Sequence, residues 1–160
     1  SAIYVVRDPR DVAISYSKHF DHNLITSTNV LMDDKNYNVS PNFTRAEFIS
    51  SWNLHVESWL KTSFPVLVLK YEDLIQFPEN SIEKILNFLR IETNITIPQI
   101  IEKTSFKQLS RLENKLGFFE SNKKNKFFRK GEMNQWKKQN FNFDKIINKF
   151  STTMKKLNYI

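Results

Sequence analysis

Two short apolar segments rich in β-forming residues constrain the fold of this chain most. The first covers residues 1–6 and the second covers residues 65–70. Nearly continuous apolar runs of this length are typical of strands that are buried on both faces of a sheet. Helical patterns lie between and after the two segments. This alternation predicts an α/β fold with at least two parallel strands.

The position of the first strand also bears on domain organisation. A strand buried on both faces needs a neighbour on each side, yet here it opens the chain at Ser1, with no initiating Met and no signal-peptide layout. We therefore expect a fragment, with further structure upstream of residue 1.

The helical segments are predicted from caps and from the spacing of apolar residues. Asp8 and Pro9 supply an N-cap and a first-turn proline for a helix that ends near His19. Thr44 and Glu47 form a capping box, which predicts a helix that starts there and runs to about Leu60.

Further elements are expected in the second half of the chain. Helices are predicted from Pro78, over residues 98–111, and over residues 143–157 with Asn142 as a cap. Polar, turn-rich composition predicts loops over residues 21–42 and 113–128.

Composition excludes several classes of protein and of site. The hydrophobic fraction of 40% excludes a disordered chain, and the longest apolar run, residues 64–69, is too short to span a bilayer. The absence of cysteine excludes disulfides and thiol chemistry, and we expect a cytoplasmic location. The only two glycines, Gly117 and Gly131, cannot form a glycine-rich phosphate loop.

Charge is unevenly distributed along the chain. Residues 1–100 carry a net charge of −3, whereas residues 101–160 carry +10. This asymmetry indicates that the second part meets an anion, which could be a nucleic acid, a membrane surface or a phosphorylated ligand.

Several residues stand where open α/β sheets bind ligands. Arg7 and Tyr71 follow the two predicted strands, whose carboxyl ends share one sheet edge. Ser15 lies two helical turns beyond Arg7, and Arg129 precedes Gly131 in a basic segment that could approach a phosphate. Spacing alone leaves open the simpler interpretation of surface ion pairs and solvated polar residues.

Four segments occur in the order and at the approximate separations of a known family. They are residues 4–16, 66–74, 104–107 and 128–131, the last followed by Trp136. Together they closely resemble the sulfotransferases that use 3′-phosphoadenosine 5′-phosphosulfate (PAPS), especially those of the cytosolic type. The resemblance covers essentially all 160 residues.

This resemblance implies a P-loop NTPase-like, three-layer α/β sandwich with a parallel sheet, of which residues 1–160 form the C-terminal part of a single sulfotransferase domain. The phosphosulfate loop and the catalytic histidine of the family lie upstream of the first strand, so no catalytic residue is expected in this chain and the fragment alone is expected to be inactive. The resemblance assigns binding of the 3′-phosphate and adenine to the following residues: Arg7, Ser15, Tyr71, Thr104, Phe106, Phe128, Arg129, Lys130 and Gly131.

The implied reaction moves a sulfuryl group from PAPS to a hydroxyl or amine of a small acceptor: an alcohol, a phenol or an amine. No metal, nucleic-acid partner or membrane span is expected, and the sequence yields no expectation for the oligomeric state. One departure lies in the late motif, where Asn134 and Gln135 replace the family's Gly-Asp before Trp136. We expect this loop to be altered but still able to close over the nucleotide.

Two other functions remain open from the residues alone. One is a P-loop nucleotide kinase fragment, and the other is a non-enzymatic basic module that binds nucleic acid. The histidines add little: His19 and His22 have metal-compatible spacing but no third ligand, and His55 is expected to be half-buried and hydrogen-bonded.

Overall fold

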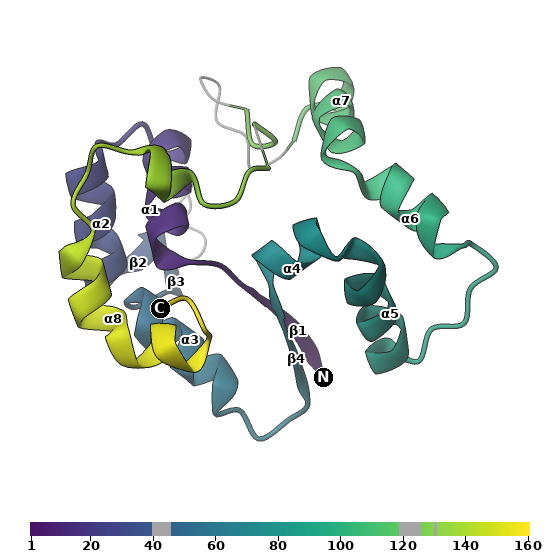
Figure 1. Ribbon diagram of the computed structural model, residues 1–160, viewed down its shortest axis with the longest axis horizontal. Helices are drawn as coiled ribbons and strands as arrows, with labels where there is room; N and C mark the ends of the chain where they lie inside the picture. Colours follow the sequence, from purple (N-terminus) through teal and green to yellow (C-terminus); the bar gives the residue numbers. More distant parts are fainter. Residues whose placement is uncertain (40–45, 119–125, 130) are drawn as a thin grey trace. The chain divides into compact units, whose positions relative to one another are not determined.

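The computed structural model describes residues 1–39, 46–118, 126–129 and 131–160 (Figure 1). The chain divides into two compact units, each considered by itself below. The first, unit 1, contains residues 1–7 and 65–133; the second, unit 2, contains residues 8–64 and 134–160.

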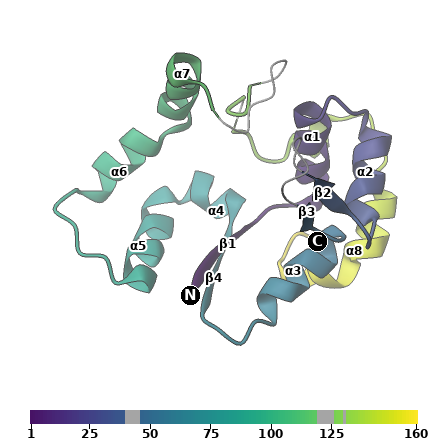
Figure 2. The ribbon, with the colours of Figure 1, turned by 180° about the vertical axis from the view of Figure 1, so that it is seen from behind.

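Unit 1 is built on a parallel pair of strands. Strand β1 (Ala2–Val6) pairs with β4 (Val66–Lys70), in a register that places Ala2 opposite Val66 and Val6 opposite Lys70. Figure 2 shows the two strands side by side. The predicted parallel pairing is confirmed, and residues 7 and 71 therefore leave the sheet at the same edge.

The expected burial of the first strand on both faces is wrong within the part of the chain that the structure describes. Side chains alternate along β1: Val6 is buried, but Ile3 and Val5 are 36% and 48% exposed. The physical reason is that β4 is the one strand paired with β1 among the described residues. A strand with one neighbour and one covered face shows alternation rather than continuous burial.

Four helices belong to the described part of unit 1. They are α4 (Tyr71–Gln76), α5 (Pro78–Leu89), α6 (Ile97–Thr104) and α7 (Phe106–Leu116). The predicted helix start at Pro78 is confirmed, and the segment over 98–111 forms the predicted short helices. The loop expected from residue 113 begins later, because α7 continues to Leu116.

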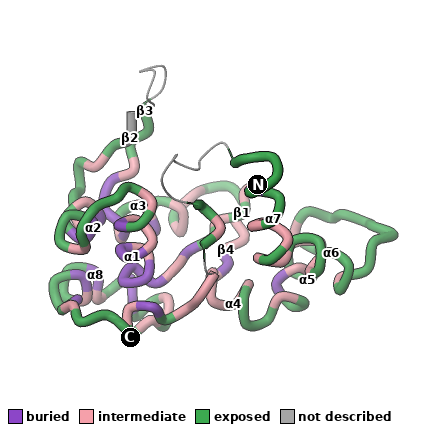
Figure 3. The backbone as a smooth tube through the Cα atoms, turned by 90° about the horizontal axis from the view of Figure 1, so that it is seen from above, coloured by how far each residue is buried: buried purple, intermediate pink, exposed green. Residues whose placement is uncertain are grey.

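Unit 2 packs helices around an apolar core. Helix α1 (Pro9–His19) begins as predicted at Asp8, whose carboxylate accepts a hydrogen bond from the Arg10 backbone N–H at 2.9 Å. Helices α3 (Trp52–Leu60) and α8 (Asp144–Lys156) pack together, with the Trp52 and Phe150 ring centroids 5.4 Å apart. Figure 3 shows buried residues along much of α1 and on part of α8. Among the described residues of this unit, the buried apolar side chains include Ala13, Ile14, Leu31, Trp52, Val56, Phe143, Ile146, Phe150 and Met154.

Two predictions for unit 2 are wrong. The segment 21–42, expected to be a loop, contains helix α2 (Leu24–Met32) and strand β2 (Tyr37–Val39). The start of helix α2 is capped by Asn23, whose side-chain oxygen accepts the Thr26 N–H at 2.8 Å. Asparagine is common both in turns and at helix N-caps, so the polar composition of this segment predicted a loop where Asn23 starts a helix.

The helix predicted from the capping box is also misplaced. Ala46–Phe48 forms strand β3, antiparallel to β2, and the helix begins only at Trp52. The backbone N–H groups of Ile49 and Ser50 both donate to the Asn36 carbonyl, and Ser50 has φ +63°. This turn ends the hairpin and prevents an earlier helix. Thr44 lies outside the described residues.

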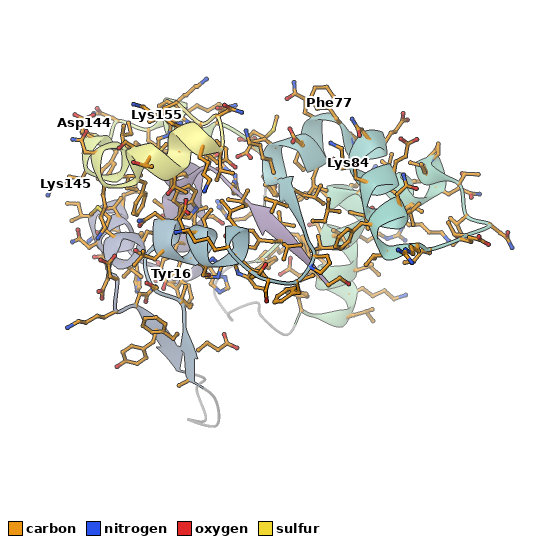
Figure 4. All side chains as sticks on the ribbon, turned by 90° about the horizontal axis from the view of Figure 1, so that it is seen from below. Tyr16, Phe77, Lys84, Asp144, Lys145 and Lys155 are labelled. Carbon is orange, nitrogen blue, oxygen red and sulfur yellow. The ribbon has the colours of Figure 1, made fainter. Side chains whose placement is uncertain are left out.

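Helix α8 agrees with its prediction closely. The N-cap position is Phe143 rather than the predicted Asn142, although the Asn142 side-chain oxygen, one residue earlier, accepts the Asp144 N–H at 2.7 Å. Figure 4 shows the side chains of Lys145 and Lys155 on this helix, and both residues are exposed. In the parts of the chain that the structure describes, no helix has both the length and the apolar character that a membrane span requires.

The packing of α8 against α3 leads to a prediction about stability. Phe150→Ala should lower the free energy of unfolding by about 3–5 kcal/mol, because it leaves a cavity beside Trp52 in a closely packed core. Chemical denaturation measures this change. The control is Lys155→Ala on the same helix, which should change stability by less than about 0.5 kcal/mol. Equal effects of the two substitutions would contradict the described core.

Candidate functional site

Arg7 lies at the carboxyl end of β1 and contacts the first residue after β4. Its guanidinium carbon lies 4.3 Å from the centroid of the Tyr71 ring, a cation–π geometry. Its Nη2 donates a hydrogen bond of 2.7 Å to the Glu132 carbonyl. The two strand-end residues that sequence analysis placed at one edge therefore meet, and the contact with Glu132 brings residues 131–133 to the same place.

Gly131 lies against an aromatic ring of helix α7. A Cβ at this position would stand 2.6 Å from Cδ2 of Phe106, and the glycine adopts φ +61°. Both observations require glycine here, since L-residues rarely adopt this backbone conformation and the ring leaves no room. Two of the predicted site residues, Phe106 and Gly131, are thus in contact.

Phe106 also contacts the residue that precedes Arg129. The ring centroids of Phe106 and Phe128 are 6.0 Å apart in an edge-to-face arrangement. Phe118 and Phe127 extend this aromatic cluster. Arg129 itself is exposed, and its backbone N–H donates to the Phe127 carbonyl at 3.0 Å. The structure thus gathers most of the predicted binding residues of unit 1 around α7 and the ends of the strands.

The remaining predicted site residues are less closely tied to this group. Thr104 is the last residue of α6, is exposed, and donates its hydroxyl proton to the Ile100 carbonyl at 2.8 Å. Ser15 is half-buried on α1 and belongs to unit 2. Lys130 lies outside the described residues.

Glu113, a buried acid of α7, is a residue of this region that the sequence motifs did not predict. Its two carboxylate oxygens accept the backbone N–H groups of Phe127 and Phe128, at 2.7 and 3.0 Å. A signal was available, since residues 106 and 113 are seven apart and lie on one face of a helix. The prediction of a loop from residue 113 obscured it.

Trp136 is held by acidic and basic residues of α1. Its backbone N–H donates to Asp11 Oδ1 at 3.0 Å, and its ring lies 3.7 Å from the Arg10 guanidinium carbon. Arg10 makes a two-pronged ion pair with Asp8, with N–O distances of 2.6 and 2.9 Å, and donates to the Tyr159 carbonyl at 3.0 Å. Arg10 and Asp11 are 5% and 0% exposed, so this network is part of the interior of unit 2. Neither residue was predicted from the sequence to have a role.

His55 has the structural role that the sequence predicts. His55 is half-buried, and its Nε2 accepts the Trp59 indole N–H at 3.4 Å, which confirms the expectation. Burial lowers the pKa of His55, so its imidazole is neutral at pH 7. Among the described residues, no group of three or more acidic or histidine side chains could hold a metal ion.

A sulfotransferase domain model matches residues 1–158. The chain belongs to the sulfotransferase family. It is 32% identical over 162 residues to sulfotransferase 1B1 of Canis lupus familiaris, covering 92% of this chain and 53% of that protein. Over 152 residues it is 32% identical to cytosolic sulfotransferase 5 of Arabidopsis thaliana, covering 84% of this chain and 45% of that protein. This sulfotransferase chain spans about half the length of such relatives.

Solved structures confirm the predicted α/β fold of the P-loop-like class. Mouse sulfotransferase SULT7A1, complexed with PAP, has a TM-score of 0.71 at 24% identity, over 95% of this chain and 57% of its own. Retinol dehydratase, in a complex with retinol and PAP, has a TM-score of 0.65 at 22% identity, over 93% and 45%. At these identities the likeness concerns the fold.

The contact between Gly131 and Phe106 leads to a prediction. Gly131→Ala should lower the free energy of unfolding by about 2–4 kcal/mol, because it adds backbone strain and forces the Phe106 ring to move. Denaturation of the variant measures the loss. In the double variant with Phe106→Ala the steric part disappears, so the two losses should be less than additive by roughly 1 kcal/mol or more. Strict additivity would show that the ring and the glycine do not meet.

Proposed function

We propose that this chain is the nucleotide-binding, C-terminal part of a single sulfotransferase domain, and that it binds the 3′-phosphate and adenine of PAPS. The observation that carries the proposal is the meeting, within unit 1, of the Arg7 strand end with the segment that contains Arg129 and Gly131. In the whole protein, a sulfuryl group would pass from PAPS to a hydroxyl or amine of a small acceptor.

The donor set suits a phosphate dianion. Arginine presents planar, permanently charged N–H groups that match phosphate oxygens. Arg7 is oriented by the Tyr71 ring and the Glu132 carbonyl, and Arg129 extends from an ordered turn into solvent. Family resemblance adds Ser15, Lys130 and the Gly131 N–H to this set.

Adenine binding is proposed for the aromatic residues of the same unit. Tyr71, Phe106 and Phe128 supply ring faces and edges on which a purine can stack. Thr104 keeps oxygen lone pairs available as acceptors, since its hydroxyl proton is donated to its own helix. The complexes of SULT7A1 and retinol dehydratase with PAP support a nucleotide of this kind.

The chemistry of transfer would be in-line attack by the acceptor oxygen or nitrogen on sulfur, with release of adenosine 3′,5′-bisphosphate. The proton acceptor and the groups that bind the phosphosulfate are proposed to lie upstream of residue 1 in the whole protein. This chain's own part is to hold the 3′-phosphate and the adenine, and thereby to orient the reacting end.

The acceptor is proposed to be a small alcohol, phenol or amine. Retinol dehydratase, which is described in complexes with retinol and with androsterone, supports a small hydroxyl-bearing molecule. The relative named cytosolic sulfotransferase 5 supports a cytoplasmic location. Membership of the family argues against the nucleotide-kinase alternative, and a role in nucleic-acid binding becomes an outcome of the test below.

The proposal predicts selectivity for the 3′-phosphate. In the full-length protein, Arg129→Ala should weaken binding of adenosine 3′,5′-bisphosphate by about 1.5–3 kcal/mol, the range for hydrogen bonds to charged groups. Binding of adenosine 5′-monophosphate, which lacks the 3′-phosphate, should change little and should be at least about a hundredfold weaker in the unaltered protein. Calorimetric titration measures both affinities.

The matched control is Lys103→Ala, which removes one exposed positive charge from α6 in the same unit. It should leave the affinity for adenosine 3′,5′-bisphosphate within about twofold, since exposed charges interact weakly through water and salt. Equal affinity of the unaltered protein for the two nucleotides would sink the proposal. Salt-dependent binding of generic DNA, unaffected by adenosine 3′,5′-bisphosphate, would favour the nucleic-acid alternative.

A further inference from the structure

Glu113 is a buried carboxylate whose two oxygens have the same kind of partner. The residue is 8% exposed, and an ionised carboxylate in such a place requires compensating hydrogen bonds. It receives them from consecutive backbone amides: Oε1 accepts from Phe127 at 2.7 Å, and Oε2 accepts from Phe128 at 3.0 Å. One side chain of α7 thus clamps a stretch of backbone 14 and 15 residues further along the chain.

The clamped amides immediately precede Arg129. The Arg129 N–H donates to the Phe127 carbonyl, so the arginine follows directly from the clamped turn. Hydrogen bonds from backbone N–H groups to a charged acceptor are short and strong, and they limit the positions that the Arg129 Cα can take.

Helix α7 holds the other side of the same segment through Phe106. The Phe106 ring packs edge-to-face with Phe128 and lies against the Cα of Gly131. Residues 106 and 113 are on one face of α7. In the sequence, Arg129 therefore lies between two positions that α7 contacts: the amides bound by Glu113 and the glycine that lies against Phe106.

We propose that Glu113 is a positioning residue for the 3′-phosphate site: its carboxylate fixes the backbone from which Arg129 reaches the phosphate. This inference rests on the proposed function and adds to it a group that does not touch the ligand. Electrostatics alone would give Glu113 the opposite effect, because a nearby negative charge repels a phosphate. The sign of the mutational effect therefore separates positioning from simple charge.

The test is Glu113→Gln in the full-length protein. The amide can accept one of the two N–H groups, but its NH₂ group faces the other with a donor, so the clamp is broken without a change of size. We expect the affinity for adenosine 3′,5′-bisphosphate to fall about tenfold, a change of 1.4 kcal/mol. Affinity for adenosine 5′-monophosphate should fall by less than the affinity for adenosine 3′,5′-bisphosphate, because that nucleotide uses the Phe128 ring but not Arg129.

Two further variants make the result specific. Glu102→Gln removes an exposed charge from α6 and should leave both affinities within about twofold. In the Arg129→Ala background, Glu113→Gln should cause a much smaller loss of affinity for adenosine 3′,5′-bisphosphate than in the unaltered protein, since the arginine that it positions is gone. If Glu113→Gln does not fold, Glu113→Asp, which withdraws the carboxylate by one methylene, replaces it and should show a smaller loss of the same kind.

The outcomes are distinct. A Glu113 variant that keeps the unaltered protein's selectivity for the 3′-phosphate, or binds adenosine 3′,5′-bisphosphate more tightly, overturns the positioning role. Additive losses for Glu113→Gln and Arg129→Ala overturn it as well. An unaltered protein that binds both nucleotides equally overturns the proposed function itself, whatever Glu113 does.

Discussion

The parallel pairing of β1 with β4 is the constraint on which the candidate site depends. In a parallel pair both strands end at the same edge, and the register of Val6 with Lys70 places the next residues, Arg7 and Tyr71, together. Their cation–π contact orients the guanidinium, and its hydrogen bond to the Glu132 carbonyl joins a segment more than a hundred residues away. A change of register would separate these groups, since it would move residue 71 along the sheet edge.

In both units a buried carboxylate accepts backbone N–H groups of the segment 127–136. In unit 2, Asp11 accepts the backbone N–H of Trp136; in unit 1, Glu113 accepts those of Phe127 and Phe128. Each carboxylate is buried, and each is stabilised by N–H groups of a segment that forms little regular structure. Acidic residues thus hold the backbone of a basic part of the chain, in which Arg129 is exposed.

Local sequence signals correctly predicted the elements whose start is determined by neighbouring residues. Asp8 with Pro9, and Pro78, mark helix starts that the structure confirms, because caps and first-turn prolines act within a few residues. The same logic failed for residues 44–51. There a strand pairing and a turn at Ser50, held by the Asn36 carbonyl, override a local capping pattern. Tertiary and cross-strand hydrogen bonds outweigh a preference worth about 1 kcal/mol.

The sequence by itself determined the class of fold, the two parallel strands and the family, because strand runs, caps and short motifs are local patterns of residue type. It also placed Arg7 and Tyr71 at one edge, since the carboxyl ends of parallel strands must coincide. The contact of Gly131 with Phe106, the Glu113 clamp and the burial of Arg10 and Asp11 were decided only by the tertiary structure. Each of these joins segments far apart in the chain, and such contacts depend on distances in space that residue types and spacing do not encode.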